Sequence, residues 1–143
     1  MKSVRGHTAL VFLFRSDSAY LVNFESKNFR TLFEAEFEIR DVQGWTTLMH
    51  LCHASPNLLK NYFWFIEPLL KQASVITKHD DSAITCFIRN IRKFVDFNSY
   101  GFMRLWNTEL HGKKISAEYL ICHAPGVLNL NSRLISKLLN MEI

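Results

Sequence analysis

The residues best suited to chemistry are three neighbouring side chains of metal-ligand type, His50, Cys52 and His53. Neutral imidazole and thiolate are both good zinc ligands. If this segment is a helix, His50 and His53 share a face while Cys52 points elsewhere, and no fourth ligand follows at zinc-finger spacing. A buried cysteine with two surface or loop-capping histidines accounts for the pattern better. We therefore expect no metal and no cofactor here.

A nucleophilic cysteine is the second chemical possibility. Cys86 or Cys122 would need a nearby base and an electropositive pocket, and on a helix the ring of His123 points away from its neighbour Cys122. The acidic pair Asp80 and Asp81 is more simply a turn cap than a catalytic carboxylate pair. The chain contains no GxGxxG, P-loop, GxSxG or HExxH pattern. We expect this protein not to be an enzyme.

A short segment with fainter copies must position these side chains. Its fullest version consists of an Asp, a Gly, a Thr and a Leu, at Asp41, Gly44, Thr46 and Leu48. A downstream copy keeps the spacing with Asp80, Ala83, Thr85 and Phe87, and an upstream copy keeps Gly6, Thr8 and Leu10. The copies are about 40 residues apart, within the range typical of stacked helical repeats.

The apolar spacing after each copy predicts a helix. Leu48, Leu51 and Cys52 follow an i, i+3, i+4 pattern. The segment 9–14 is apolar on all sides and β-prone, and the recurrence favours a helix there. A second apolar block follows, at 29–33, 65–70 and 134–139. Each unit is therefore predicted to be a helix, a loop, a second helix and an extended linker. Residues 96–112 are predicted to connect the third and fourth units, with turn formers at 96–101 and either a helix or a strand at 102–106.

The pattern resembles the ankyrin repeat, whose signature is D-x-x-G-x-T-P-L-H-x-A. The resemblance implies one all-α domain, residues 1–143, built as an ankyrin-like solenoid. Its units would span about 4–40, 41–79, 80–112 and 113–143, three clear and the fourth degenerate. The chain departs from the signature because Thr47 stands at the proline position and Met49 at the histidine position. The resemblance therefore predicts a fold but no inherited partner.

Ankyrin repeats commonly bind other proteins through their projecting turns. The resemblance thus implies a non-catalytic protein–protein interaction module that binds through its projecting turns and concave face. Such a module would be either an adaptor or a structural component of a larger assembly. A virus- or parasite-encoded ankyrin protein that captures a host factor would use the same chemistry. The aromatic run 62–65 could be either core or interface. The predicted contact residues lie on the turn edge and are Arg40, Val42, Gln43, Trp45, Lys78, His79, Asp81 and Ile84.

Charge supports a different class of partner as an alternative. The formal net charge is +4, with 17 Lys and Arg against 13 Asp and Glu. A basic accessory protein of a ribonucleoprotein particle would use clustered cations to contact RNA phosphates, with a steep dependence on salt. The candidate contacts are Arg89, Arg92, Lys93, Lys113 and Lys114.

Composition fits an ordinary folded domain. Hydrophobic residues make up 48% of the chain, and only five glycines and three prolines occur, which favours helices over a turn-rich β-sandwich. Three cysteines without a CxxC pair suggest reduced thiols. No signal peptide is evident and the apolar segment 8–14 is too short to span a membrane. We expect a cytoplasmic protein that does not bind a membrane, with the nucleus as the alternative location.

Overall fold

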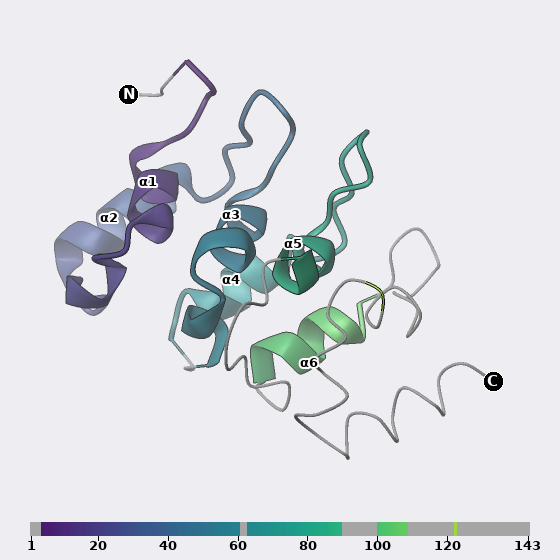
Figure 1. The fold of residues 1–143 in the computed structure, drawn as a ribbon. Helices are drawn as coiled ribbons and strands as arrows, with labels where there is room; N and C mark the ends of the chain where they lie inside the picture. The colour runs from purple at the N-terminus through teal and green to yellow at the C-terminus, as the bar shows by residue number, and fades with distance from the viewer. Residues whose placement is uncertain (1–3, 61–62, 90–99, 109–121, 123–143) are drawn as a thin grey trace.

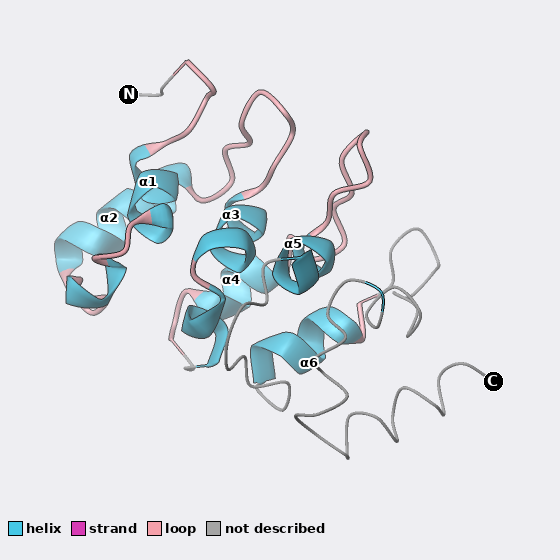
Figure 2. Cartoon of the chain, in the orientation of Figure 1, coloured by secondary structure: helices cyan, strands magenta, loops and turns pink. Residues whose placement is uncertain are grey.

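The computed structural model describes residues 4–60, 63–89, 100–108 and 122, and within these ranges every regular element is helical. The predicted all-α class is therefore confirmed for this part of the chain (Figures 1 and 2). The α-helices are α1 (Ala9–Arg15), α2 (Lys27–Glu36), α3 (Thr47–Ala54), α4 (Ile66–Leu70), α5 (Ala83–Arg89) and α6 (Tyr100–Trp106). Two 3₁₀ helices, η1 (Ala19–Leu21) and η2 (Pro56–Lys60), lie in the connections.

Helix α3 lies at the centre of the arrangement, packed between α1 and α5. The other helices lie behind this row: α2 contacts α1, α4 contacts α3, and α6 contacts both α4 and α5. The three segments that lead into α1, α3 and α5 all extend to the same side of the molecule (Figure 1). This arrangement places three turns next to one another along one edge.

Helices α1, α3 and α5 begin in the same way. Thr8 and Thr46 each accept a hydrogen bond at Oγ1 from the backbone N–H three residues on, at 3.2 Å in both cases. Ser82 accepts the corresponding bond from Thr85 at 3.3 Å. These are N-caps, which satisfy backbone donors that the first helical turn leaves unpaired. Two residues before each cap the backbone has a positive φ: 78° at Gly6, 84° at Gly44 and 64° at Asp80.

The third copy therefore starts earlier than the sequence predicted. The prediction matched Asp80 to Asp41, Ala83 to Gly44 and Thr85 to Thr46. In the structure Thr77 is the counterpart of Asp41. The side-chain oxygen of each accepts hydrogen bonds from the backbone N–H groups two and four residues further along the chain. Asp80 then takes the place of Gly44, and Ser82 that of Thr46. The predicted register is wrong by three residues. It was set by matching residue types, whereas the turn is defined by the side-chain oxygen that accepts its hydrogen bonds.

A polar side chain from the end of the second helix region caps each of the first two N-termini as well. Glu36 accepts from the backbone N–H of Leu10 at 3.0 Å, and Gln72 accepts from that of Leu48 at 3.1 Å. The negative charge of Glu36 also suits the positive end of the α1 dipole. Gln72 in turn donates to the carbonyl of Phe37 at 2.8 Å, so one side chain joins α3 to the end of α2.

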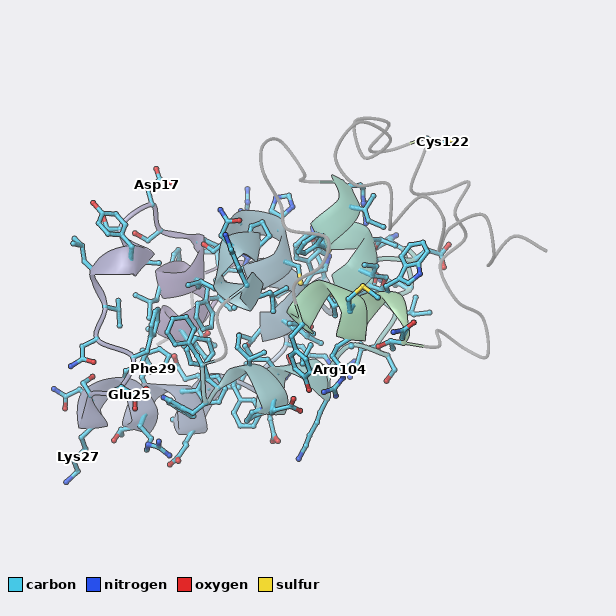
Figure 3. The ribbon with its side chains drawn as sticks, turned by 90° about the horizontal axis from the view of Figure 1, so that it is seen from below. Asp17, Glu25, Lys27, Phe29, Arg104 and Cys122 are labelled. Atoms are coloured by element: carbon cyan, nitrogen blue, oxygen red, sulfur yellow. The ribbon has the colours of Figure 1, made fainter. Side chains whose placement is uncertain are left out.

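Aromatic residues dominate the core between the two rows of helices. Phe65 is fully buried, and its ring centroid lies 5.0 Å from that of Phe24 and 5.4 Å from that of Phe29. Phe63 and Trp64 are partly buried against this cluster, and the Trp64 indole donates to the Phe24 carbonyl at 2.8 Å. Phe29 belongs to the core face of α2, whereas Lys27 points away from the rest of the protein (Figure 3).

The structure settles the conformation or burial of several segments that the sequence left open. Within the aromatic run, Phe65 is a core residue, Phe63 and Trp64 are partly buried against the core, and Tyr62 lies outside the described residues. The segment 9–14 is helical, and 100–106 within the predicted connection is α6. Pro68 lies in the first turn of α4, where its missing N–H costs no intrahelical bond. The proposed fourth unit, 113–143, lies outside the described residues apart from the exposed Cys122.

Candidate functional site

Asp41 organises the turn that leads into α3. One carboxylate oxygen, Oδ1, accepts hydrogen bonds from the backbone N–H groups of Gln43 and Trp45, both at 2.9 Å. The backbone closes the same turn through a bond from Asp41 N to the Trp45 carbonyl at 3.1 Å. Local chain geometry thus fixes the orientation of the carboxylate and leaves the second oxygen, Oδ2, directed elsewhere.

The second oxygen of Asp41 meets two histidines that are distant in sequence. His50 Nε2, from α3, lies 2.9 Å from Asp41 Oδ2, and His7 Nε2, from the first turn, lies 3.5 Å from it. The side chains of His7, Asp41 and His50 are only 12%, 4% and 3% exposed, respectively. The arrangement is a compact cluster of two imidazoles and a carboxylate between the first and second turns.

Arg15 fixes the tautomer of His50. Its Nη1 lies 3.2 Å from His50 Nδ1, and a guanidinium has no acceptor, so Nδ1 must accept. The proton of neutral His50 is therefore on Nε2 and is donated to Asp41. Burial lowers the pKa of His50 to about 4, outweighing the neighbouring carboxylate, which raises it. His50 is thus a neutral, oriented imidazole near pH 7.

A cleft of about 350 Å³ opens above this cluster. The wall combines cationic, imidazole and indole side chains from four segments, namely the first turn, α1, the second turn and α3. Its residues are Arg5, His7, Arg15, Asp41, Val42, Gln43, Trp45, His50 and His53. The Trp45 ring packs 5.0 Å from the ring of His50 and 5.5 Å from that of His53. The cleft can therefore admit a small ion or the side chain of another molecule.

The predicted contact residues differ in their exposure to solvent. Arg40, Gln43, Lys78 and His79 are exposed, and Val42 is 72% exposed although apolar. Trp45 is half-buried and donates its indole N–H to Asp81 Oδ2 at 2.9 Å, and Asp81 also pairs with Arg89. Ile84 is 1% exposed in the core, so its prediction as a surface contact is wrong, a consequence of the register error in the third turn.

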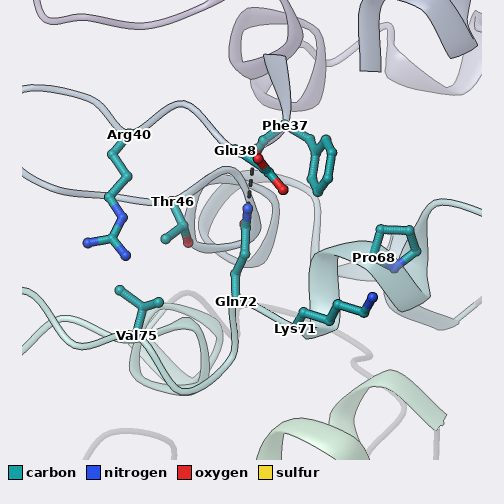
Figure 4. Close-up of a pocket in the computed structure, with 8 residues that line it drawn as sticks. All are labelled: Phe37, Glu38, Arg40, Thr46, Pro68, Lys71, Gln72 and Val75. Atoms are coloured by element: carbon teal, nitrogen blue, oxygen red, sulfur yellow. Dashed lines mark hydrogen bonds between the residues drawn. The ribbon is translucent and has the colours of Figure 1, made fainter. Parts of the chain in front are cut away.

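A second cleft, also about 350 Å³, lies between the end of α2 and α4 (Figure 4). Gln72 crosses it to reach the Phe37 carbonyl, and Arg40 and Lys71 contribute cationic groups on either side. The other residues of its wall are Glu38, Thr46, Pro68 and Val75. Gln72 is engaged with both α3 and Phe37, so its amide belongs to the scaffold of this cleft.

Cys52 and Cys86 are not activated as nucleophiles. Cys52 and Cys86 are buried, and burial raises the pKa of the Cys86 thiol to about 12 and that of Cys52 well above its ordinary value. Cys122 is exposed. Cys52 also does not join His50 and His53 in a common ligand set, since it faces the core.

The predicted RNA contacts are mostly outside the described residues. This holds for Arg92, Lys93, Lys113 and Lys114. Arg89 forms an ion pair with Asp81 and donates to the carbonyl of Thr85 at 3.3 Å, so its guanidinium is engaged within the protein. RNA binding stays a prediction. No described helix is long and apolar enough to cross a membrane.

Sequence reasoning found His50 but missed its partners, His7 and Asp41. The signal in the sequence was the place of each residue in its turn. His7 directly precedes the capping Thr8, and Asp41 is the first residue of the next turn. Two successive turns that project side by side bring such positions together. Comparisons with models of protein families, with curated proteins and with solved structures found no match to this chain.

Proposed function

We propose that this protein is a divergent ankyrin-like repeat stack that binds another protein through its projecting turns, without catalysis. The observation that supports the proposal is the recurrence of one turn geometry. A residue with positive φ precedes an N-capping hydroxyl at the start of α1, α3 and α5. Repeat stacks present such recurring loops as an extended binding surface.

The exposed side chains of the second and third turns suit a protein partner. Val42 and Lys78 occupy the same position in their turns, each directly after the residue that supplies the closing oxygen. Both are exposed, and Gln43 and His79 follow them. Val42 would give a partner a small apolar contact surrounded by polar and cationic groups. As an adaptor or assembly component, the protein would offer this edge to its partner.

Photo-crosslinking from these two equivalent positions tests the proposal. A benzophenone amino acid is placed singly at Val42, at Lys78, or at the control position Lys27, which is exposed on α2 (Figure 3). We expect the same partner to be crosslinked in cells from positions 42 and 78 but not from position 27. Equal crosslinking from all three positions, or none from the two turns, would refute binding through the turns. Circular dichroism of each variant establishes that it is folded.

A further inference from the structure

We propose that His7, Asp41 and His50 form a binding site for a divalent transition-metal ion of the zinc type. The site lies at the base of the cleft between the first and second turns. It goes beyond the proposed binding of a protein partner and does not depend on it. The three ligand atoms belong to three separate segments, the first turn, the second turn and α3, so an ion held there would join them.

The spacing of the three atoms suits one ion. His50 Nε2 and His7 Nε2 lie 2.9 Å and 3.5 Å from Asp41 Oδ2, and all three atoms are within 4.8 Å of one another. Zinc binds nitrogen at about 2.0–2.1 Å and carboxylate oxygen at about 2.0–2.2 Å, so ligand atoms around a tetrahedral ion are roughly 3.3 Å apart. The two separations measured from Asp41 Oδ2 bracket that value, and the ligand atoms of the two imidazoles lie within 4.8 Å of each other.

The carboxylate is held ready for this role. Asp41 Oδ1 is occupied by the amides of Gln43 and Trp45, which leaves Oδ2 as the oxygen that meets the imidazoles. Hydrogen bonds that orient a ligand in this way are a usual part of metal sites. Two imidazoles and one carboxylate favour zinc over calcium or magnesium, which prefer oxygen ligands alone. The cleft above the cluster provides space for water as a further ligand.

Arg15 is the group that opposes the ion. Its guanidinium donates to His50 Nδ1, which keeps the proton on Nε2. Coordination by Nε2 requires that nitrogen to lose its proton while Nδ1 gains one, so His50 remains a neutral imidazole of the other tautomer. The Nδ1–H then faces the Arg15 donor, and Arg15 must turn away. Arg15 is exposed and has room to do so. Metal and Arg15 thus compete for His50.

Calorimetric titration of the full-length protein with ZnCl₂ tests the site. All variants carry Cys122→Ser, which removes the exposed thiol as an alternative ligand. We expect one ion to bind per chain, and His7→Gln and Asp41→Asn to weaken binding by more than about tenfold, as loss of even an orienting group costs 10–100-fold. Asp41→Asn retains an acceptor for the two amides, so the turn should survive. His7→Gln is an independent variant in a different segment.

Two comparisons make the test specific. His79→Gln changes an exposed histidine of the third turn and should leave zinc affinity unchanged. Arg15→Gln removes the competing donor and should strengthen zinc binding, a response that adventitious binding to surface histidines would not give. Failure of the parent protein to bind zinc, or unchanged affinity in His7→Gln, would overturn the proposal. Unfolding of each variant in the presence of a chelator shows that the metal-free proteins are folded.

Discussion

The second and third turns share one hydrogen-bonding pattern but build it from different residues. In the second turn a carboxylate, Asp41, accepts from two backbone amides at 2.9 Å, and glycine takes the positive φ. In the third turn a hydroxyl, Thr77, accepts the equivalent bonds at 3.3 and 3.1 Å, and Asp80 takes the positive φ. The requirement is an acceptor oxygen and a residue that tolerates a left-handed backbone, and several residue types meet it.

The two turns also differ in what lies beyond the shared bonds. Asp41 is ionisable and reaches the buried His50, so its turn is connected to α3 and to the first turn. Thr77 is neutral and bonds only within its own turn in the contacts described above. The second turn should therefore contribute more to the stability of the fold than the third. Four substitutions test that inference.

Asp41→Ala should be the most destabilising of the four. It removes two charge-assisted bonds and leaves the buried Nε2–H of His50 without its acceptor, so we expect a loss of about 3 kcal/mol in the free energy of unfolding. Urea denaturation followed by far-ultraviolet circular dichroism measures it. The control Asp41→Asn keeps an amide oxygen for the turn and should lose clearly less. Equal losses for Ala and Asn would show that the turn bonds contribute little.

Among the four, Gly44→Ala should cause the second-largest loss in the free energy of unfolding. A Cβ at this position meets nothing closer than Thr77 Cγ2 at 3.7 Å, so its cost comes from the left-handed backbone alone, about 1–2 kcal/mol. Gly6→Ala is the matched comparison, because its Cβ would also lie 3.1 Å from the Val42 backbone nitrogen and should cost more. Thermal unfolding of both variants gives the order. A smaller loss for Gly6→Ala would contradict it.

Thr77→Val should cost about 1 kcal/mol, since it removes two long, neutral hydrogen bonds while keeping the side-chain volume. The expected loss is well below that of Asp41→Ala, and urea denaturation compares them directly. Thr77→Asp tests the same comparison in the opposite direction, because it gives the third turn the acceptor of the second. If Thr77→Val destabilised as much as Asp41→Ala, the difference inferred between the turns would be wrong.

Asp80→Gly should have the smallest effect and the opposite sign. Asp80 has a φ of 64°, which an aspartate tolerates at a modest cost and a glycine adopts freely. We expect a gain of about 0.5 kcal/mol in the free energy of unfolding, partly offset by the greater freedom of glycine in the unfolded chain. Differential scanning calorimetry would detect the rise in the unfolding temperature. A fall would mean that the Asp80 side chain stabilises the turn.

The sequence was sufficient to predict α1 to α5 and the first two turns, whereas α6 was left open between helix and strand. Gly44 and Thr46 have strong individual preferences, for a left-handed backbone and for an N-cap, so their spacing carries structural information. The third turn lacks both the Asp and the Gly of the second turn. Residues Asp80 to Thr85 match the residue types of the second turn better, so the sequence alignment placed the third turn three residues too late. Ser82, a favoured capping residue, was the signal that could have corrected it.

The cluster around His50 could not be derived in the same way. It depends on the distance between His7 and Asp41, which is set by how two turns pack and not by any local preference. The aromatic run illustrates the same limit. Four consecutive aromatic residues do not reveal which will be covered, and Trp64 is partly buried because α2 places Phe29 and Phe33 against it. Local residue preferences predict where helices and turns form. Which side chains meet across two helices or turns depends on how those elements pack.

The caps supplied by Glu36 and Gln72 have a consequence for how the chain folds. Each joins the start of a first helix to the end of its own second helix, across 26 and 24 residues. The entropic cost of closing a loop rises with its length, so contacts across about 25 residues cost less to form than contacts across the whole chain. Because contacts close in sequence favour rapid folding, we expect either helix pair to nucleate the structure and the neighbouring pair to add to it.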